Sequence, residues 1–160
     1  MDASHLDDLL DAIEASLPEL SPWMGWAVDW NRQESVHYLR SANDPNDIAF
    51  AVTVDGRASG IIGILVPKPV QSWGEIGYWL RSDLSGRKIM TEGLRQAIEW
   101  AFTVRGLHRL ELRAALENAP SNRLAEKHGF SLRGVVREAA RGSNGWYDCN
   151  LWDLLATDPR

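Results

Sequence analysis

The stretch Ser85-Gly86-Arg87-Lys88-Ile89-Met90-Thr91-Glu92 comes shortly after the segment Glu75-Ile76-Gly77-Tyr78-Trp79-Leu80. The earlier segment has the apolar and aromatic content of a strand, and a glycine turn then opens an amphipathic helix. A strand, turn and helix in this order gather unpaired backbone N–H groups at one point, where the helix dipole also favours negative charge. We therefore expect a phosphate-binding turn at Gly86. On this motif alone, an ordinary helix start with two solvated cations, Arg87 and Lys88, is an equal alternative.

Outward from this motif, strand and helix patterns alternate along the chain, which predicts a mixed α/β fold with three layers. An antiparallel meander comes first, and strand, helix, strand, helix and strand follow. We expect four helices, over 6–17, 32–42, 89–102 and 120–128. Pro18 closes the first helix, Asn31 is the N-cap of the second, and Gly106 stops the third. We expect strands over 48–54, 59–66 (ended by Pro67 and Pro69), 73–80, 108–114, 132–139 and 146–155, with hairpin turns at 55–56 and 142–145.

Length and composition limit the class of protein. The 160 residues, 44% hydrophobic and 24% charged, suit a single globular domain over 1–160. The net charge of −5 argues against broad binding to nucleic acid. The lone Cys149 cannot form an internal disulfide, and the longest apolar run, 61–67, could not cross a bilayer. We therefore expect a cytoplasmic protein with no membrane partner, and a homodimer stays open.

A second motif lies further along, where Asn118-Ala119-Pro120-Ser121 enters a short helix that ends in Glu126-Lys127-His128-Gly129-Phe130. Helix capping alone explains either Asn118 or Ser121. Together with the segment from Glu75 to Glu92, however, this motif resembles the GNAT N-acetyltransferases, specifically the RimJ/RimL-like branch. The resemblance runs from about 17 to 155.

The resemblance implies a central, mostly antiparallel twisted sheet flanked by helices, and acetyl-CoA as cosubstrate. In this family the backbone amides of the turn before the long helix wrap the pyrophosphate of coenzyme A, which implies roles for Gly86, Arg87, Lys88, Ile89 and Met90. Gly86 matches the family pattern, whereas Lys88 stands where a second glycine is usual and Ser85 where arginine or glutamine is frequent. The family also begins with a strand before its first helix, which is missing or shortened here and leaves one sheet edge open.

The same resemblance implies which residues take part in the reaction and bind the pantetheine arm. Asn118 would bind the pantetheine arm, and Ser121 would donate a proton to the departing thiolate. Glu75 would accept a proton from the amine, directly or through water. Free backbone groups of Tyr78, Trp79 and Leu80, on a splayed central strand, would pair with pantetheine.

Trp23 and Trp26 lie in the loop where the family builds its acceptor site, and contact with the acceptor and core filling are about equally expected for them. We expect packing roles for the other six tryptophans: Trp30, Trp73, Trp79, Trp100, Trp146 and Trp152. Cys149 is expected as a small buried hydrophobe and His128 at a helix C-terminus. The four histidines are scattered, so no metal site is predicted.

The sequence thus favours acetyl transfer from acetyl-CoA to a primary amine by direct attack in a ternary complex, and another acyl group stays open. A noncatalytic acyl-CoA-binding or regulatory module is the alternative, motivated by Ser85, Lys88 and the absent first strand. The acceptor is left open among a protein N-terminus, an aminoglycoside, an aminoacyl nucleotide and a polyamine.

Overall fold

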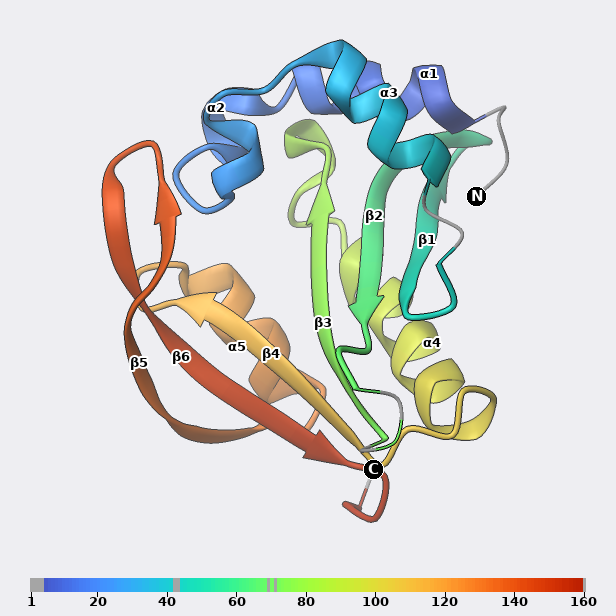
Figure 1. Cartoon of the computed structure of the whole chain (residues 1–160), viewed down its shortest axis with the longest axis vertical. Coiled ribbons are helices and arrows are strands. Elements are labelled where there is room, and N and C mark those ends of the chain that lie inside the picture. Colours follow the sequence, from blue (N-terminus) through green and yellow to red (C-terminus); the bar gives the residue numbers. More distant parts are fainter. Residues whose placement is uncertain (1–4, 42–43, 69, 71, 160) are drawn as a thin grey trace.

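Six strands form one mixed sheet in the order β1-β2-β3-β4-β6-β5 (Figure 1). The computed structural model describes residues 5–41, 44–68, 70 and 72–159, without the side chains of 37–41. All neighbouring strands are antiparallel except β3 and β4. The strands are β1 (Asp47–Val54), β2 (Arg57–Leu65), β3 (Trp73–Leu80), β4 (Arg109–Ala115), β5 (Ser131–Gly142) and β6 (Gly145–Leu155).

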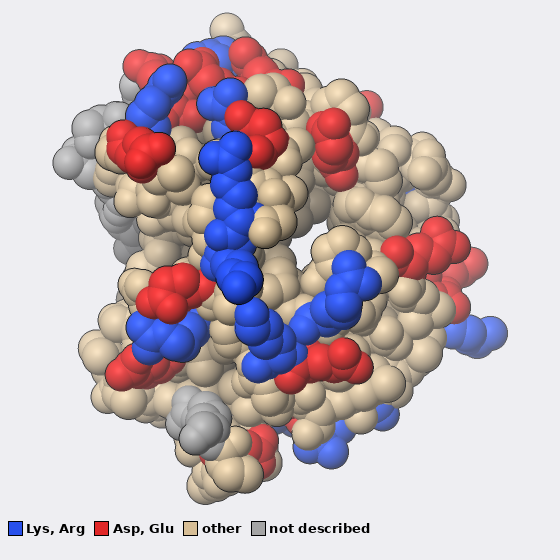
Figure 2. Space-filling model, turned by 180° about the vertical axis from the view of Figure 1, so that it is seen from behind, with Lys and Arg blue, Asp and Glu red and all other residues tan. Residues whose placement is uncertain are grey.

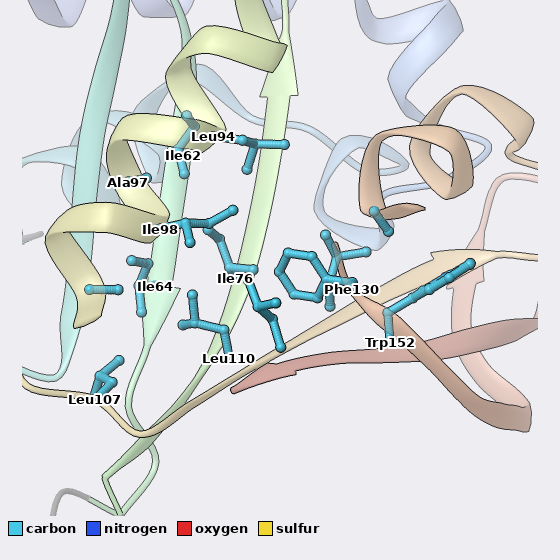
Figure 3. Packing of buried hydrophobic residues seen from close by; sticks show 14 of the residues in the cluster. Ile62, Ile64, Ile76, Leu94, Ala97, Ile98, Leu107, Leu110, Phe130 and Trp152 are labelled. Carbon is cyan, nitrogen blue, oxygen red and sulfur yellow. The ribbon is translucent and has the colours of Figure 1, made fainter. Parts of the chain in front are cut away.

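Helices cover both faces of the sheet, which confirms the predicted three layers (Figure 1). They are α1 (Leu6–Glu14), α2 (Leu17–Leu20), α3 (Arg32–Ser41), α4 (Ile89–Thr103) and α5 (Ala119–Lys127), with 3-10 turns η2 (Gly25–Ala27) and η4 (Ser82–Leu84). The apolar face of α4 packs on alternate strand residues such as Ile62, Ile64 and Ile76, and Phe130 and Trp152 extend this core below α5 (Figure 3). The opposite strand faces, with Ala58 and Trp79, meet α1 and Leu20 of α2.

The central strands diverge. Strand β3 pairs with β4 only from Trp73 to Glu75, opposite Arg109 to Glu111, although both strands continue beyond these residues. Figure 1 shows the β1-β2-β3 half and the β4-β6-β5 half separating from that point like the arms of a V. Within the described chain, the edge of β3 that faces β4 therefore has no strand partner after Glu75, and we call this opening the wedge.

Three sequence expectations need correction. The first helix does not run to residue 17: α1 ends at Glu14, and Pro18 lies in the first turn of a separate helix, α2, because a proline without N–H is tolerated there. The final hairpin is longer than expected, since β5 starts at Ser131 and continues to Gly142. Packing does not explain Trp146, whose side chain is 64% exposed.

Other expectations hold. The Oδ1 atom of Asn31 accepts hydrogen bonds from the N–H groups of Gln33 (2.8 Å) and Glu34 (3.2 Å), so Asn31 caps α3 as predicted. Cys149 is buried, and burial raises the pKa of its thiol, as suits a packing residue. The expectation that the family's first strand is missing or shortened, the helix end at Ala42 and the strand stop at Pro69 concern residues outside the described part of the chain.

Candidate active site

The turn before α4 forms one wall of a cavity of about 250 Å³, which we call the phosphate cavity. The residues expected to hold pyrophosphate, Gly86 to Met90, all line this cavity. No side chain caps the first turn of α4, so its leading N–H groups are free to bind an anion. The complete lining is Leu84, Gly86, Arg87, Lys88, Ile89, Met90, Thr91, Pro120, Arg123, Leu124 and Lys127.

Two residues of the turn have left-handed backbone conformations. Gly86 has φ +78° and Lys88, the N-cap of α4, has φ +63°. Glycine adopts this region without a steric penalty, whereas lysine does so at a cost. The backbone at 88 therefore keeps the conformation that explains why a glycine is usual there, and the lysine adds a cationic side chain.

Two cations on the facing wall were missed by sequence reasoning. Arg123 and Lys127 line the phosphate cavity from α5, opposite the turn. Their spacing of four residues places both side chains on one face of a helix, and this is the signal that could have found them. The face of the molecule that carries α4 and α5 shows a stripe of Lys and Arg side chains (Figure 2). Four cations and free amides suit a polyphosphate.

The N-terminus of α5 is joined to β3 by a side-chain hydrogen bond. The hydroxyls of Tyr78 and Ser121 lie 2.8 Å apart. Burial raises the pKa of Tyr78, although the bond to Ser121 opposes this, so the phenol stays protonated at neutral pH. The sequence resemblance assigned only the backbone of Tyr78, and no local pattern reveals a contact between residues 43 positions apart.

Asn118 and Asn122 fix the start of α5. The Oδ1 atom of Asn118 accepts the N–H of Ser121 at 3.2 Å, so Asn118 is the N-cap. The amide of Asn122 donates to the carbonyls of Ala115 and Asn118. Its Oδ1 accepts from two β6 side chains, Nδ2 of Asn150 (2.8 Å) and Nε1 of Trp152 (3.0 Å). These bonds hold Ser121 at the wedge.

The pairing of β3 decides which backbone groups face the wedge. Arg81 N–H donates to Ser59 on the β2 side, and the carbonyl of Ser72 accepts from His108 on the β4 side. Because neighbouring residues of a strand direct their backbone groups to opposite edges, those of Tyr78 and Leu80 face the wedge. Those of Trp79 face β2, so the expectation that Trp79 offers free groups to pantetheine is wrong. The Leu80 side chain packs against the α4 core and lines neither cavity described here.

On the other face of the sheet, a pocket of about 870 Å³ contains Glu75, Tyr78 and Trp79 together with Trp23 and Trp26. We call it the acceptor pocket. It is of the size usual for small-molecule sites. Its other lining residues are Ile13, Met24, Gly25, Asp29, Trp30, Asn31, Glu34, Ser35, Asp47, Ile61, Gly63, Leu65 and Gly77.

The two loop tryptophans are placed differently in that pocket. Trp23 makes an edge contact with Tyr147, whose hydroxyl donates to the Trp23 carbonyl. Trp26 is 45% exposed and tilted against Trp79, with ring centroids 6.1 Å apart. Position 25 requires glycine because the backbone of Arg141 lies close to it, and a Cβ at this position would be 2.9 Å from the Arg141 carbonyl oxygen. The closing hairpin thus holds this loop in position.

Glu75 lies at the end of the paired part of β3, where the wedge begins. Its carboxylate is about one third exposed, and its nearest cation is Arg113, at 3.9 Å. A base there is accessible to an amine in the acceptor pocket. Among the described residues, no group of histidine, cysteine and carboxylate side chains could hold a metal ion.

The divided sheet, the phosphate cavity at the start of α4 and the pocket beside Glu75 are together typical of the GNAT class of proteins. The model of the Acetyltransferase (GNAT) domain matches residues 1–131, and the chain belongs to this family. One relative is YdaF of Bacillus subtilis (strain 168), by its name a candidate ribosomal N-acetyltransferase. It is 30% identical over 127 residues, which cover 79% of this chain and 65% of YdaF.

Solved structures agree in fold. A RimL ribosomal L7/L12 alpha-N-protein acetyltransferase in complex with coenzyme A superposes with a TM-score of 0.87, at 20% identity over 97% of this chain and 90% of that one. Mycobacterium smegmatis RimJ in complex with CoA-disulfide has a TM-score of 0.85 and 25% identity, over 98% of this chain and 79% of that one. No helix in the described part of the chain is long and apolar enough to span a membrane.

Proposed function

We propose that this protein transfers the acetyl group of acetyl-CoA to a primary amine by direct attack in a ternary complex. The observation that carries the proposal is the hydrogen bond between Tyr78 and Ser121. It places a serine hydroxyl at the free edge of β3, between the phosphate cavity and the acceptor pocket. The relatives named for ribosomal acetylation and the neighbours solved with coenzyme A support the same reaction.

The phosphate cavity suits the pyrophosphate of the cosubstrate, through the amides of the α4 start and the side chains of Arg87, Lys88, Arg123 and Lys127. Pantetheine would then follow the wedge, where the backbone groups of Tyr78 and Leu80 are free to pair with its amides. Asn118, next to Ser121 at the start of α5, would bind pantetheine through its side-chain amide. The thioester would reach Ser121 and Glu75, and the acceptor would enter from the opposite face. An opening that passes through the molecule beside the basic stripe supports access from both faces (Figure 2).

The chemistry needs one base and one acid. The amine nitrogen attacks the thioester carbonyl carbon, the C–S bond breaks, and Glu75 accepts the proton that the nitrogen loses. Ser121 donates its proton to the thiolate sulfur, and the serine oxygen regains a proton from solvent when the products leave. For this, the Ser121 oxygen must accept the hydrogen bond from Tyr78, and a phenol with a raised pKa remains a donor at neutral pH. Tyr78 is thus proposed as the residue that positions the Ser121 hydroxyl.

The direct test is release of free thiol from acetyl-CoA in the presence of a panel of primary amines. We expect wild-type protein to turn over at least one amine. Ser121→Ala should lower kcat more than it lowers CoA affinity, because the hydroxyl acts when thiolate charge develops. Ser143→Ala, in the exposed turn between β5 and β6, is the matched control. CoA binding without turnover of any amine would instead indicate a binding module.

We further propose a cytoplasmic homodimer that uses the edge strand β5. Leu132 and Val135 on this strand are each 52% exposed, and one edge of β5 has no partner strand in the described sheet. Light scattering should give twice the chain mass of 17.9 kDa. Val135→Lys should reduce it to a single chain, whereas a monomeric wild type would contradict the proposal.

A further inference from the structure

The acceptor pocket is acidic. Four carboxylates line it, from Asp29 after η2, Glu34 in α3, Asp47 at the start of β1 and Glu75 in β3. The lining contains no lysine, arginine or histidine. The pocket on the other face has the opposite charge, with four cations and no carboxylate. The two substrates of a ternary complex thus meet cavities of opposite sign.

These carboxylates are not neutralised by the described part of the protein. Carboxylates elsewhere, such as Asp8 and Glu14, pair with arginines. No described side chain forms an ion pair with Asp29, Glu34 or Asp47, and Glu75 has only Arg113 at 3.9 Å. Only Glu75 is needed as a base. Asp29, Glu34 and Asp47 do not lie on β3, the strand that carries Glu75. They are therefore free to bind a second positive charge of the acceptor, away from the nitrogen that is acetylated.

The walls between the carboxylates are aromatic. Trp23, Trp26, Trp30 and Trp79 line the same pocket. Indole faces attract ammonium and guanidinium groups, and their surfaces pack against methylene chains. Carboxylates and indole faces together therefore favour an apolar chain that ends in a cation.

We propose that the acceptor carries at least two positive charges: the amine that is acetylated beside Glu75, and a second ammonium or guanidinium held by Asp29, Glu34 and Asp47. This inference rests on the proposed function and names the acceptor class for that site. It disfavours anionic acceptors such as an aminoacyl nucleotide. A small oligoamine and a polypeptide N-terminus followed by a basic residue share this chemistry.

The test compares acceptors that differ only in the second charge. Hexamethylenediamine and hexylamine form one pair, and the peptide amides Ala-Lys-Ala and Ala-Gln-Ala form the other. Thiol release gives kcat/KM, and calorimetry gives the affinity of each acceptor without depending on turnover. We expect the dication of at least one pair to be preferred by about tenfold, and the preference to shrink with added salt.

Substitutions in the acceptor pocket show which carboxylates cause the preference for dications. Each of Asp29→Asn, Glu34→Gln and Asp47→Asn should reduce the ratio of dication to monocation by about threefold, and the triple variant should bring it close to one. Asp7→Asn, an exposed position outside the pocket in the first turn of α1, is the charge-matched control and should leave the ratio unchanged.

The outcomes are distinct. Preference in the diamine pair alone identifies a small oligoamine, and preference in the peptide pair identifies a basic N-terminus. Equal kcat/KM and equal affinity within both pairs would overturn the inference and leave acetyl transfer standing. Failure of every amine to release thiol would contradict the proposed function, and calorimetry would still decide whether the pocket selects dications.

Discussion

At the scale of single residues, Tyr78 has a testable role that is separate from the fold. Tyr78→Phe removes the hydroxyl that holds Ser121 and keeps the ring. We expect kcat to fall by about two- to tenfold, the value of one hydrogen bond, with little change in the KM for acetyl-CoA. Tyr147→Phe is the matched control, since its hydroxyl holds the Trp23 carbonyl and its loss should raise the acceptor KM instead. If both variants keep wild-type kcat, Ser121 needs no positioning by Tyr78.

Lys88 has a strained backbone conformation, and its side chain adds a positive charge to the phosphate cavity. One substitution tests both effects, because they are measured separately. Lys88→Gly should stabilise the protein by about 1 kcal/mol, because glycine adopts φ +63° without strain. The same change should weaken CoA binding and flatten its salt dependence, since one cation of the phosphate cavity is lost. Chemical denaturation and calorimetry measure the two effects. Unchanged affinity with an unchanged salt slope would show that the Lys88 side chain does not contact phosphate.

At the scale of elements, the position of α5 depends on one partly buried side-chain amide, that of Asn122. Asn122→Ala would leave the Asn150 and Trp152 donors without their acceptor, whereas the carbonyls of Ala115 and Asn118 would keep their backbone N–H donors. We expect a loss of about 2–3 kcal/mol in the free energy of unfolding, or roughly 4–12 °C in Tm for a domain of this size. Asn144→Ala, exposed in the final hairpin turn, should cost less than about 0.5 kcal/mol. Equal Tm values for the two variants would mean that other contacts place α5.

Local patterns predicted elements better than they predicted contacts between elements. Strand β3 and helix α4 were found almost to the residue, because alternation, a glycine turn and an apolar stripe are all local signals. The site depends on pairings that such signals do not specify: Tyr78 with Ser121, and α5 cations opposite the α4 turn. Trp79 shows the same limit, since only the strand register reveals that its backbone groups face β2. Pro18 misled because a proline can start a helix as well as end one.

At the scale of the whole molecule, stability should depend on pH through His128. Burial, and secondarily the charge of Lys127, lowers the pKa of this C-cap imidazole below 6.5. The unfolded chain then binds more protons than the folded one in that window. The contribution of the neutral His128 side chain to the free energy of unfolding is therefore fully present above about pH 6.5. It is lost as the pH falls through the pKa of His128 in the folded protein. Between pH 5 and 7, the Tm of His128→Asn should therefore depend less steeply on pH than the Tm of the wild type, and equal slopes would contradict this role of His128.

In the proposed reaction, the two substrates meet from opposite faces of a divided sheet. The phosphate cavity lies beside α4 and α5, the acceptor pocket beside the loop of Trp23 and Trp26, and β3 separates them. The proposed reaction depends most on Glu75, because this residue stands where β3 leaves β4 and is the proposed acceptor of the amine proton.

The most direct measurement is the pH profile of CoA thiol release by wild type, Glu75→Gln and the exposed control Glu126→Gln, with amide product identified by mass spectrometry. We predict acetylated amine from wild type and control, and a fall of about 100-fold or more for Glu75→Gln with a changed acid limb. Folded Glu75→Gln protein that releases thiol at the wild-type rate across the profile would contradict the account, because the amine would then lose its proton elsewhere.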